Sequence, residues 1–401
     1  SNNPPRSPLK RRAHTVHMAT ESPSYRGPAF LSYGFRPFFL SAALFAGIAI
    51  PVWALILTGW TDSPFRYAPR DWHVHEMLFG FLPAVITGFL LTAMPNWTDR
   101  PPLKGTPLLA LVTLWLAGRL TIAMPWPTPF VAAFIDAGYL VVLAAIVWRE
   151  ITAGKAWDRA PIGIVISLYA AANILFHVLA LSGSETDLPE RMAIALMMLL
   201  LTLIGGRVTP SFTGDYLAEQ GLSEELPAFS RFDGAAILLT AMAALSWTIQ
   251  PLAMATGWLL IAAGLANVIR LSRWRGWTTW REPIVLILHV GYGWLALALL
   301  IIGGATLGFG LKPADAVHAL TTGAVGAMTM AVMTRASLGH TGRPKHADRL
   351  TILIYMLVNL GALLRVFGAT IGLPTTLILG TAAAAWSGAY LLFAVTYGSS
   401  L

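Results

Sequence analysis

The sequence predicts an all-helical membrane protein that crosses the bilayer twelve times. Of its 401 residues, 56% are hydrophobic and only 11% are charged, whereas a soluble domain carries roughly 25% charged residues. The apolar residues fall into runs of about 18–24 residues, each long enough to cross a bilayer as a helix. The chain has no cysteine, which excludes disulfides, cysteine-held iron–sulfur clusters and thiolate-ligated haem.

Twelve apolar runs follow one another along the chain. They cover residues 38–59, 73–94, 107–124, 129–148, 161–182, 190–210, 233–250, 252–271, 284–304, 314–336, 350–370 and 373–396. Only Gln250 and Pro251 separate the seventh run from the eighth, so a tight turn is predicted there. The polar, basic and proline-rich residues 1–37 predict a flexible cytoplasmic tail before a single transmembrane domain over residues 38–401. We do not expect His14 or His17, in this tail, to bind a metal.

The basic residues predict the orientation of the chain. The net charge is +8, and the Lys and Arg residues outside the spans divide between the two sides of the membrane as 21 and four. The four are Arg66, Arg70, Arg191 and Lys312. Because basic residues accumulate in cytoplasmic loops, we expect both termini to lie in the cytoplasm. The charge is thus a topology signal, and it does not indicate binding to nucleic acid. No Walker motif and no dinucleotide fingerprint is present.

Three spans share a sequence pattern. The second, sixth and tenth spans all run toward the cytoplasm, and each ends in a polar motif: MPNWTDR (94–100), GGRVTPSFTG (205–214) and TRASLGHTGR (334–343). The recurrence every four helices predicts a pseudo-threefold repeat of four-helix units. The alternative is that three loops are built alike without a repeat.

Ionisable side chains inside the apolar spans indicate a cofactor site. Such residues are energetically costly in a membrane and usually functional. With 1.5 Å of rise per residue, six of them fall in one leaflet: His73, His75, His177, His318, Arg119 and Arg365. This set is typical of haem, because imidazoles ligate the iron and arginines neutralise the propionates. The alternatives are hydrogen bonds between helices for the histidines, and pairing with Asp136 or Asp315 for the arginines.

The motif WHVHEMLFGF (72–81) carries three of the ionisable groups. His73 and His75 point about 200° apart on a helix, so they cannot ligate one metal together. His73 and Met77 share a face and form a candidate copper site, with simple packing as the alternative. Glu76 is a candidate proton carrier or partner of a metal ligand; alternatively, it pairs with Arg66 or Arg70.

The sharpest hypothesis concerns two of these histidines. We predict that His75 and His318 are axial ligands to one haem or to neighbouring haems, with Asp315 accepting the second ring N–H of His318. A further cluster, with His289 and His340, lies toward the cytoplasm. It is either a second metal site or a polar plug.

Six motifs together indicate a family. They are FRPFFL (35–40), WHVHEMLFGF (72–81), GFLLTAMPNWT (88–98), NILFH (173–177), GGRVTPSFT (205–213) and ALTTGAVGAMTMAVMTRASLGHTGR (319–343). In them the chain resembles the NnrS proteins of denitrifying and nitric-oxide-exposed bacteria. The resemblance implies a twelve-helix inner-membrane protein that contains haem b and copper and is linked to tolerance of nitric oxide. It makes candidate ligands of His73, His75, His177, His289, His318 and His340, without assigning each to a metal.

A looser likeness concerns the haem–copper oxidases, which also have twelve core helices and carry haem ligands on helices two and ten. His75 and His318 lie on the second and tenth spans, but the adjacent pair of histidines expected for the copper site of those enzymes is absent.

Three functions are compatible with these features. The first is a haem enzyme that consumes nitric oxide or a derived nitrosyl species. The second is a haem or metal sensor, or protective protein, that works without turnover. The third is a transporter with a polar inward gate. The expected partners are nitric oxide or a related small ligand, membrane lipid and an electron donor that the sequence does not reveal.

Overall fold

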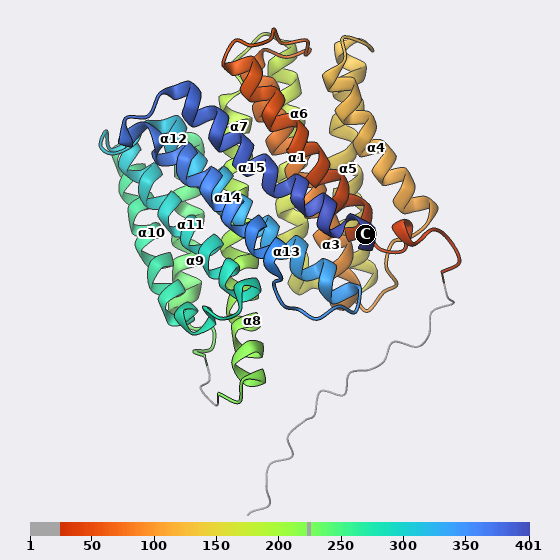
Figure 1. The fold of residues 1–401 in the computed structure, drawn as a ribbon. Helices are drawn as coiled ribbons and strands as arrows, with labels where there is room; N and C mark the ends of the chain where they lie inside the picture. The colour runs from red at the N-terminus through yellow and green to blue at the C-terminus, as the bar shows by residue number, and fades with distance from the viewer. Residues whose placement is uncertain (1–24, 223–225) are drawn as a thin grey trace, which may run out of the picture.

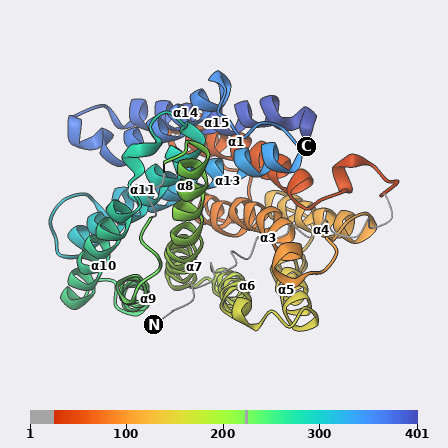
Figure 2. The ribbon, with the colours of Figure 1, turned by 90° about the horizontal axis from the view of Figure 1, so that it is seen from below.

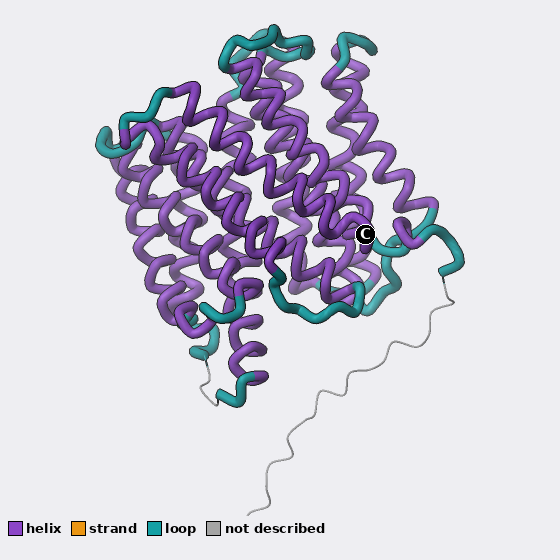
Figure 3. The backbone as a smooth tube through the Cα atoms, viewed as in Figure 1, coloured by secondary structure: helices purple, strands orange, loops and turns teal. Residues whose placement is uncertain are grey.

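The computed structural model describes residues 25–222 and 226–401. These residues are about 80% helical, and no strand occurs among them (Figure 3). Most of the expected flexible tail, including His14 and His17, lies outside the described residues. The first membrane helix begins at Phe35, three residues before the predicted boundary.

Twelve helical spans in the described chain are long and apolar enough to cross a membrane, which confirms the predicted fold class (Figure 1). Nine of them are single helices: α1 (Phe35–Leu57), α4 (Thr106–Ala123), α5 (Pro129–Ala153), α6 (Ala160–Leu181), α9 (Arg231–Ile249), α10 (Met254–Arg273), α11 (Pro283–Thr306), α14 (Arg349–Phe367) and α15 (Thr375–Tyr397). The turn predicted between the seventh and eighth spans lies between Ile249 and Met254, and the amide of Ala253 donates to the carbonyl of Gln250 there.

The other three spans are interrupted helices. The second consists of α2 (Pro69–His75), a π-helical segment (Glu76–Phe81) and α3 (Leu82–Thr98). The sixth consists of α7 (Asp187–Leu200), a π-helical segment (Leu201–Gly205) and α8 (Gly206–Glu219). The tenth consists of α12 (Pro313–His318), a π-helical segment (Ala319–Ala324) and α13 (Val325–His340). These are the spans singled out by their polar motifs.

The interrupted spans form the centre of the bundle. Figure 2 shows α3, α7 and α13 in the middle of the molecule, with helices such as α4, α5, α9 and α10 around the rim. The second and tenth spans are also the most buried of the twelve, at 78% and 72% of their apolar windows. One π-helical segment in every fourth span is the arrangement that a threefold repeat of four helices predicts. Such segments are rare and often accompany functional sites.

Each π-helical segment contains a glycine against which a large side chain packs. A Cβ atom on Gly80 would collide with the guanidinium of Arg119, and one on Gly323 would lie 2.5 Å from the ring of Trp294. A Cβ atom on Gly205 would lie 2.8 Å from the terminal methyl of Met328. The glycines therefore let neighbouring spans approach the central ones closely.

The two ends of the described chain meet on one face of the bundle. The guanidinium of Arg36, near the start of α1, donates to the carbonyl of Ser400 at 2.8 Å and to that of Leu401 at 3.3 Å. We call this face the terminal face. The second, sixth and tenth spans begin at the opposite face and run toward the terminal face.

Candidate functional site

The two histidines at the start of the second span lie in different surroundings. His73 stacks on the indole of Trp53, with ring centroids 4.7 Å apart and planes 6° apart, and it lines a large cavity. His75 is completely buried on the other side of the helix, within a cluster of polar groups. The sequence prediction that these two side chains cannot share a metal is therefore confirmed, because α2 is a regular helix at this point.

The polar cluster around His75 draws its members from five segments of the chain. We call it the His75 cluster, and it comprises Tyr67, His75, Glu76, Arg119, Asp136, Asn173 and His177. Asp136 is at its centre. One carboxylate oxygen lies 3.1 Å from Nε2 of His75 and 2.8 Å from Nε2 of His177, and the other accepts from Arg119. The amide of Asn173 donates to the same carboxylate at 3.0 Å.

The other ring nitrogen of each imidazole also has a hydrogen-bond partner. Nδ1 of His75 lies 2.9 Å from a carboxylate oxygen of Glu76, and Nδ1 of His177 lies 2.7 Å from the hydroxyl of Tyr67. Burial, together with the nearby charge of Asp136, raises the pKa of Tyr67, so its hydroxyl stays protonated. Metal-bound histidines are typically oriented in this way, through a hydrogen bond from the ring nitrogen that does not bind the metal.

The two ring nitrogens of His75 have more acceptor partners than a neutral imidazole can satisfy. Both ring nitrogens of His75 face oxygen acceptors only: those of Glu76, Asp136 and Asn173. A neutral imidazole carries a single N–H and cannot donate from both nitrogens. The contacts of His75 are therefore completed by one further proton, on the ring or on a facing carboxyl group, or by a metal ion.

Three atoms of the cluster are close enough to bind one ion. One ligand atom each from His75, Asp136 and His177 lies within 4.8 Å of the other two. Two imidazoles and a carboxylate form a set that divalent and monovalent transition metals accept. These three residues could hold a metal ion.

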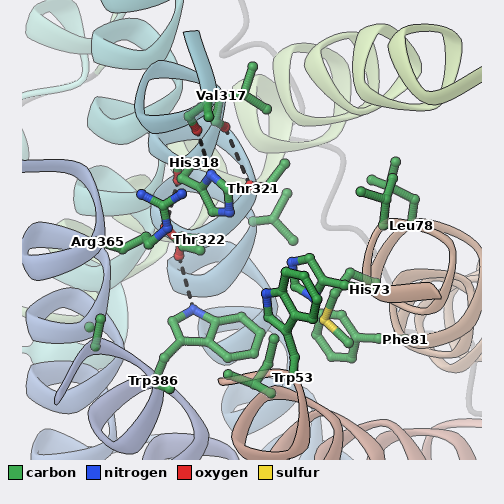
Figure 4. Close-up of a pocket in the computed structure, with 18 of the residues that line it drawn as sticks. Trp53, His73, Leu78, Phe81, Val317, His318, Thr321, Thr322, Arg365 and Trp386 are labelled. Atoms are coloured by element: carbon green, nitrogen blue, oxygen red, sulfur yellow. Dashed lines mark hydrogen bonds between the residues drawn. The ribbon is translucent and has the colours of Figure 1, made fainter. Parts of the chain in front are cut away.

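The large cavity has a volume of about 400 Å³ and lies between α1, α2, α7, α12, α14 and α15 (Figure 4). Small-molecule and cofactor pockets have volumes of about 300–1,000 Å³ and are mostly apolar with a few placed polar groups. The cavity has this composition. Its polar lining includes His73, His318, Arg70 and Arg365, and most of the remainder is apolar, such as Leu78 and Trp386.

The polar groups of the cavity are oriented by hydrogen bonds. Nδ1 of His318 donates to the carbonyl of Ala314 at 2.6 Å, a bond that leaves Nε2 as the acceptor nitrogen. Arg365 is 2.5 Å from Asp315. Arg70 forms a two-pronged pair with Glu190, with distances of 2.8 and 3.0 Å. An imidazole with an available nitrogen therefore faces an apolar chamber that also contains two guanidinium groups.

Several sequence expectations can be compared with the geometry. His75 and His318 do not line one cavity: His318 shares the cavity with His73, and His75 lies with His177. This arrangement disfavours one haem held by both and leaves their role at neighbouring sites a prediction. Asp315 pairs with Arg365, and it does not accept from His318. Of the two arginines expected near propionates, only Arg365 reaches the cavity.

Arg119 and Glu76 pair with each other in the structure, and not with the groups that the haem and surface-pairing expectations gave them. Arg119 is buried and paired with Glu76 and Asp136, so the alternative of pairing with Asp136 is confirmed. Glu76 therefore does not pair with Arg66 or Arg70. Instead, Arg66 donates to backbone carbonyls, including that of Met124.

The two remaining histidine candidates lie apart from both sites. Nε2 of His289 is 2.7 Å from the hydroxyl of Thr213, and its Nδ1 has no hydrogen-bond partner among the described residues. His340 packs against the rings of Tyr33 and Phe35, with centroids 5.5 and 5.4 Å away. Neither belongs to the set of residues that could hold a metal ion in the described chain.

Three members of the His75 cluster are not predicted as site residues from the sequence. Asp136 is expected there only as a partner for arginine, Asn173 appears only within the motif NILFH (173–177), and Tyr67 is not among the candidates. Two signals were available. Asp136 is an acidic residue inside an apolar span, which is functional by default. Asn173 and His177 are four residues apart and so share a helix face.

The family comparison agrees with the sequence motifs. The family described as "NnrS protein" matches residues 29–401, which is nearly the whole described chain. A search of curated protein sequences found no match. Family membership supports a role related to the nitric oxide response, and the His75, Asp136 and His177 set fits a metal-binding protein. With the motifs, the twelve spans and the family match in agreement, the chain belongs to the NnrS family.

Proposed function

We propose that the protein is an inner-membrane haem and copper protein that binds nitric oxide at a haem in the large cavity. The observation that carries the proposal is the position of His318. Its Nδ1 bond to Ala314 directs Nε2, the nitrogen that ligates iron, into a chamber of about 400 Å³. His73 faces the same chamber and is the second candidate ligand.

The remaining lining of the cavity fits a haem. A haem buries a flat apolar ring and carries two negative propionates, which need cationic partners. Trp53, Leu78 and Trp386 supply apolar surface. Arg70 and Arg365 are the cations of the lining, and each would exchange its carboxylate partner, Glu190 or Asp315, for a propionate. When bound, the haem would supply an iron that can bind nitric oxide. His73 is the better candidate for a displaceable ligand, because the ring of His318 is fixed by its bond to Ala314.

The His75 cluster is the proposed copper site. Glu76 and Asp136 are two carboxylates, and Arg119 is their one buried guanidinium partner. With neutral imidazoles the cluster is left with a single negative charge, and an unbalanced charge in a buried place is costly. A monovalent cuprous ion on His75 and His177 would balance it. The copper would lie behind the same short helix that carries His73 to the cavity.

The experiment is a metal and spectral analysis of the purified protein, of four test variants and of one control variant. We expect iron and copper in the wild type, with a Soret band that shifts when nitric oxide is added to the reduced protein. His318→Ala and His73→Ala should lose haem or change its spin state. His177→Ala and Asp136→Asn should lose copper and keep haem. His346→Ala is the matched control, because His346 is an exposed histidine that contacts only Glu282 among the hydrogen bonds of the described chain.

Two outcomes would overturn the assignment. One is purified wild-type protein without haem, and the other is full haem content with an unaltered spectrum in both His318→Ala and His73→Ala. Consumption of nitric oxide in the presence of an electron donor then separates an enzyme from a sensor or protective protein that only binds the gas. A transporter predicts no haem spectrum at all.

A further inference from the structure

A second, smaller cavity lies directly below the large one, toward the terminal face. It has a volume of about 100 Å³ and lies between α3, α6, α7, α8, α11, α13 and the π-helical segment Leu201–Gly205. Every lining side chain is apolar except that of Thr329. The Thr329 hydroxyl already bonds the carbonyl of Gly326 at 3.0 Å and the hydroxyl of Tyr390 at 2.6 Å.

The lining determines what this second cavity can hold. A buried water needs two to four polar partners, and an apolar cavity without them stays dry and takes up apolar guests such as xenon. The one hydroxyl here is already satisfied by protein groups. The second cavity therefore excludes water and ions and favours small uncharged molecules.

Three side chains separate the two cavities. Leu82, Met197 and Val325 line both of them, and we call these residues the septum. Each comes from a different central span. Leu82 and Val325 directly follow π-helical segments, and Met197 lies one turn before the third. Because a π-helical segment displaces the helix axis locally, the three interruptions together open space along the centre of the bundle on both sides of the septum.

The septum is made of side chains that can move. Methionine has three rotatable bonds and adapts its shape readily. Exposed side chains change rotamer in picoseconds to nanoseconds. The septum side chains are buried and move more slowly, but the cavity on each side leaves them room to move. A small molecule in the second cavity can therefore pass to the first without a movement of the helices.

We infer that the second cavity is a docking site for a small uncharged gas molecule, and that the septum is the passage from it to the large cavity. The identity of the gas as nitric oxide rests on the proposed function. Nitric oxide is small, uncharged and weakly polar, so it enters the apolar interior of a membrane and an apolar cavity alike. Seven of the lining residues are only partly buried, and they form the side from which the second cavity admits the gas: Ile86, Phe89, Ile162, Leu201, Ile204, Val208 and Val332.

The first test uses xenon on the purified full-length protein. Xenon should bind in the second cavity, detected in xenon-pressurised crystals or by ¹²⁹Xe NMR. Val332→Phe places a ring in this cavity, because Val332 lines it and does not line the large one. This variant should lose the xenon signal. Val395→Phe adds the same ring to an 80% exposed position on α15 and should leave the xenon signal unchanged.

The second test measures how fast nitric oxide reaches the haem. In stopped-flow measurements, Val332→Phe should slow association roughly tenfold, which corresponds to a barrier raised by about 1.4 kcal/mol. Val325→Ala removes two methyl groups from the septum, which widens the passage between the two cavities, and should speed association. This variant keeps the test decisive if Val332→Phe does not fold.

The outcomes separate the two proposals. Absence of xenon from the second cavity, or association rates equal to wild type in both Val332→Phe and Val325→Ala, would overturn the docking site while the haem response stands. Xenon binding in a protein whose spectrum does not respond to nitric oxide would support the docking site and overturn the proposed function.

Discussion

Removing the charge of Asp136 is the change whose effect on the free energy of unfolding the structure defines best. Asp136 is 1% exposed. One of its oxygens faces Nε2 of His75, Nε2 of His177 and the amide of Asn173, at 3.1, 2.8 and 3.0 Å, and the other accepts from Arg119. In Asp136→Asn one of these oxygens becomes an NH₂ group. Donors occupy both positions, so the new group meets a donor whichever way the amide turns.

The expected cost follows from the burial of the pair. Removing one partner of a buried ion pair destabilises a protein by about 3–5 kcal/mol, since the other charge is left uncompensated. Arg119 keeps Glu76 at 2.5 Å, so we expect a value near the lower limit, about 3 kcal/mol. Asp187→Asn is the matched control. Its carboxylate is half exposed and 3.5 Å from Arg70, and exposed pairs contribute about 0–1 kcal/mol.

The assay is SDS-induced unfolding of the detergent-solubilised protein, followed by circular dichroism. Arg119→Gln should be destabilising by itself, and the double variant Asp136→Asn with Arg119→Gln should cost less than the two single changes added together. A loss below about 1 kcal/mol for Asp136→Asn, no larger than that of Asp187→Asn, would refute the argument that this carboxylate is held by buried charge.

Three further predictions concern topology, packing and pH. A reporter fused after Leu401 should be active only in its cytoplasmic form, as the distribution of basic residues requires; activity of a periplasmic reporter there would reverse the orientation. Gly323→Ala should destabilise the protein by about 1–3 kcal/mol through overpacking, because the new methyl group would lie 2.5 Å from the Trp294 ring, whereas Gly380→Ala, with nothing within 4 Å, should not; equal SDS midpoints for the two would contradict this. Asp348→Ala should cost about 1 kcal/mol at pH 7, because the Asp348 carboxylate caps α14 by accepting from the amide of Thr351 at 2.8 Å. The hydrogen bonds from Thr351 lower the pKa of Asp348, so this stabilisation is complete above the ordinary aspartate pKa and is lost as the pH falls through the lowered one; a cost that stays the same in acid would show that the carboxylate charge is not responsible.

The spans could be predicted because the signal for them is local. A run of apolar residues long enough to cross the bilayer forms a helix wherever it lies, since only a helix satisfies its backbone groups without water. The runs therefore gave the number and order of the spans. The ends were less certain, because a helix can continue beyond the bilayer: the sixth span reaches Glu219, where the apolar run ends near residue 210.

The candidate sites were predicted only in part. Depth along each helix correctly grouped histidines toward the face opposite the terminal face, but it could not say which side of each helix meets which neighbour. His73 and His75 illustrate the limit. The helical period showed that they point apart, and only the packing of the other spans assigned His73 to the large cavity and His75 to the cluster with Asp136.

The sequence by itself determined that this chain is a twelve-span helical membrane protein, that its ionisable residues lie at unusual depth, and that it carries the motifs of one family. These properties depend on composition and on the one-dimensional order of residues. The tertiary structure alone decided that Arg119 belongs to the His75 cluster, that Arg365 and His318 share a cavity, and that three π-helical interruptions open a second cavity beneath it. These properties depend on how helices rotate and pack against one another, and residues such as Asp136 and His177, 41 positions apart, meet only when that packing is complete.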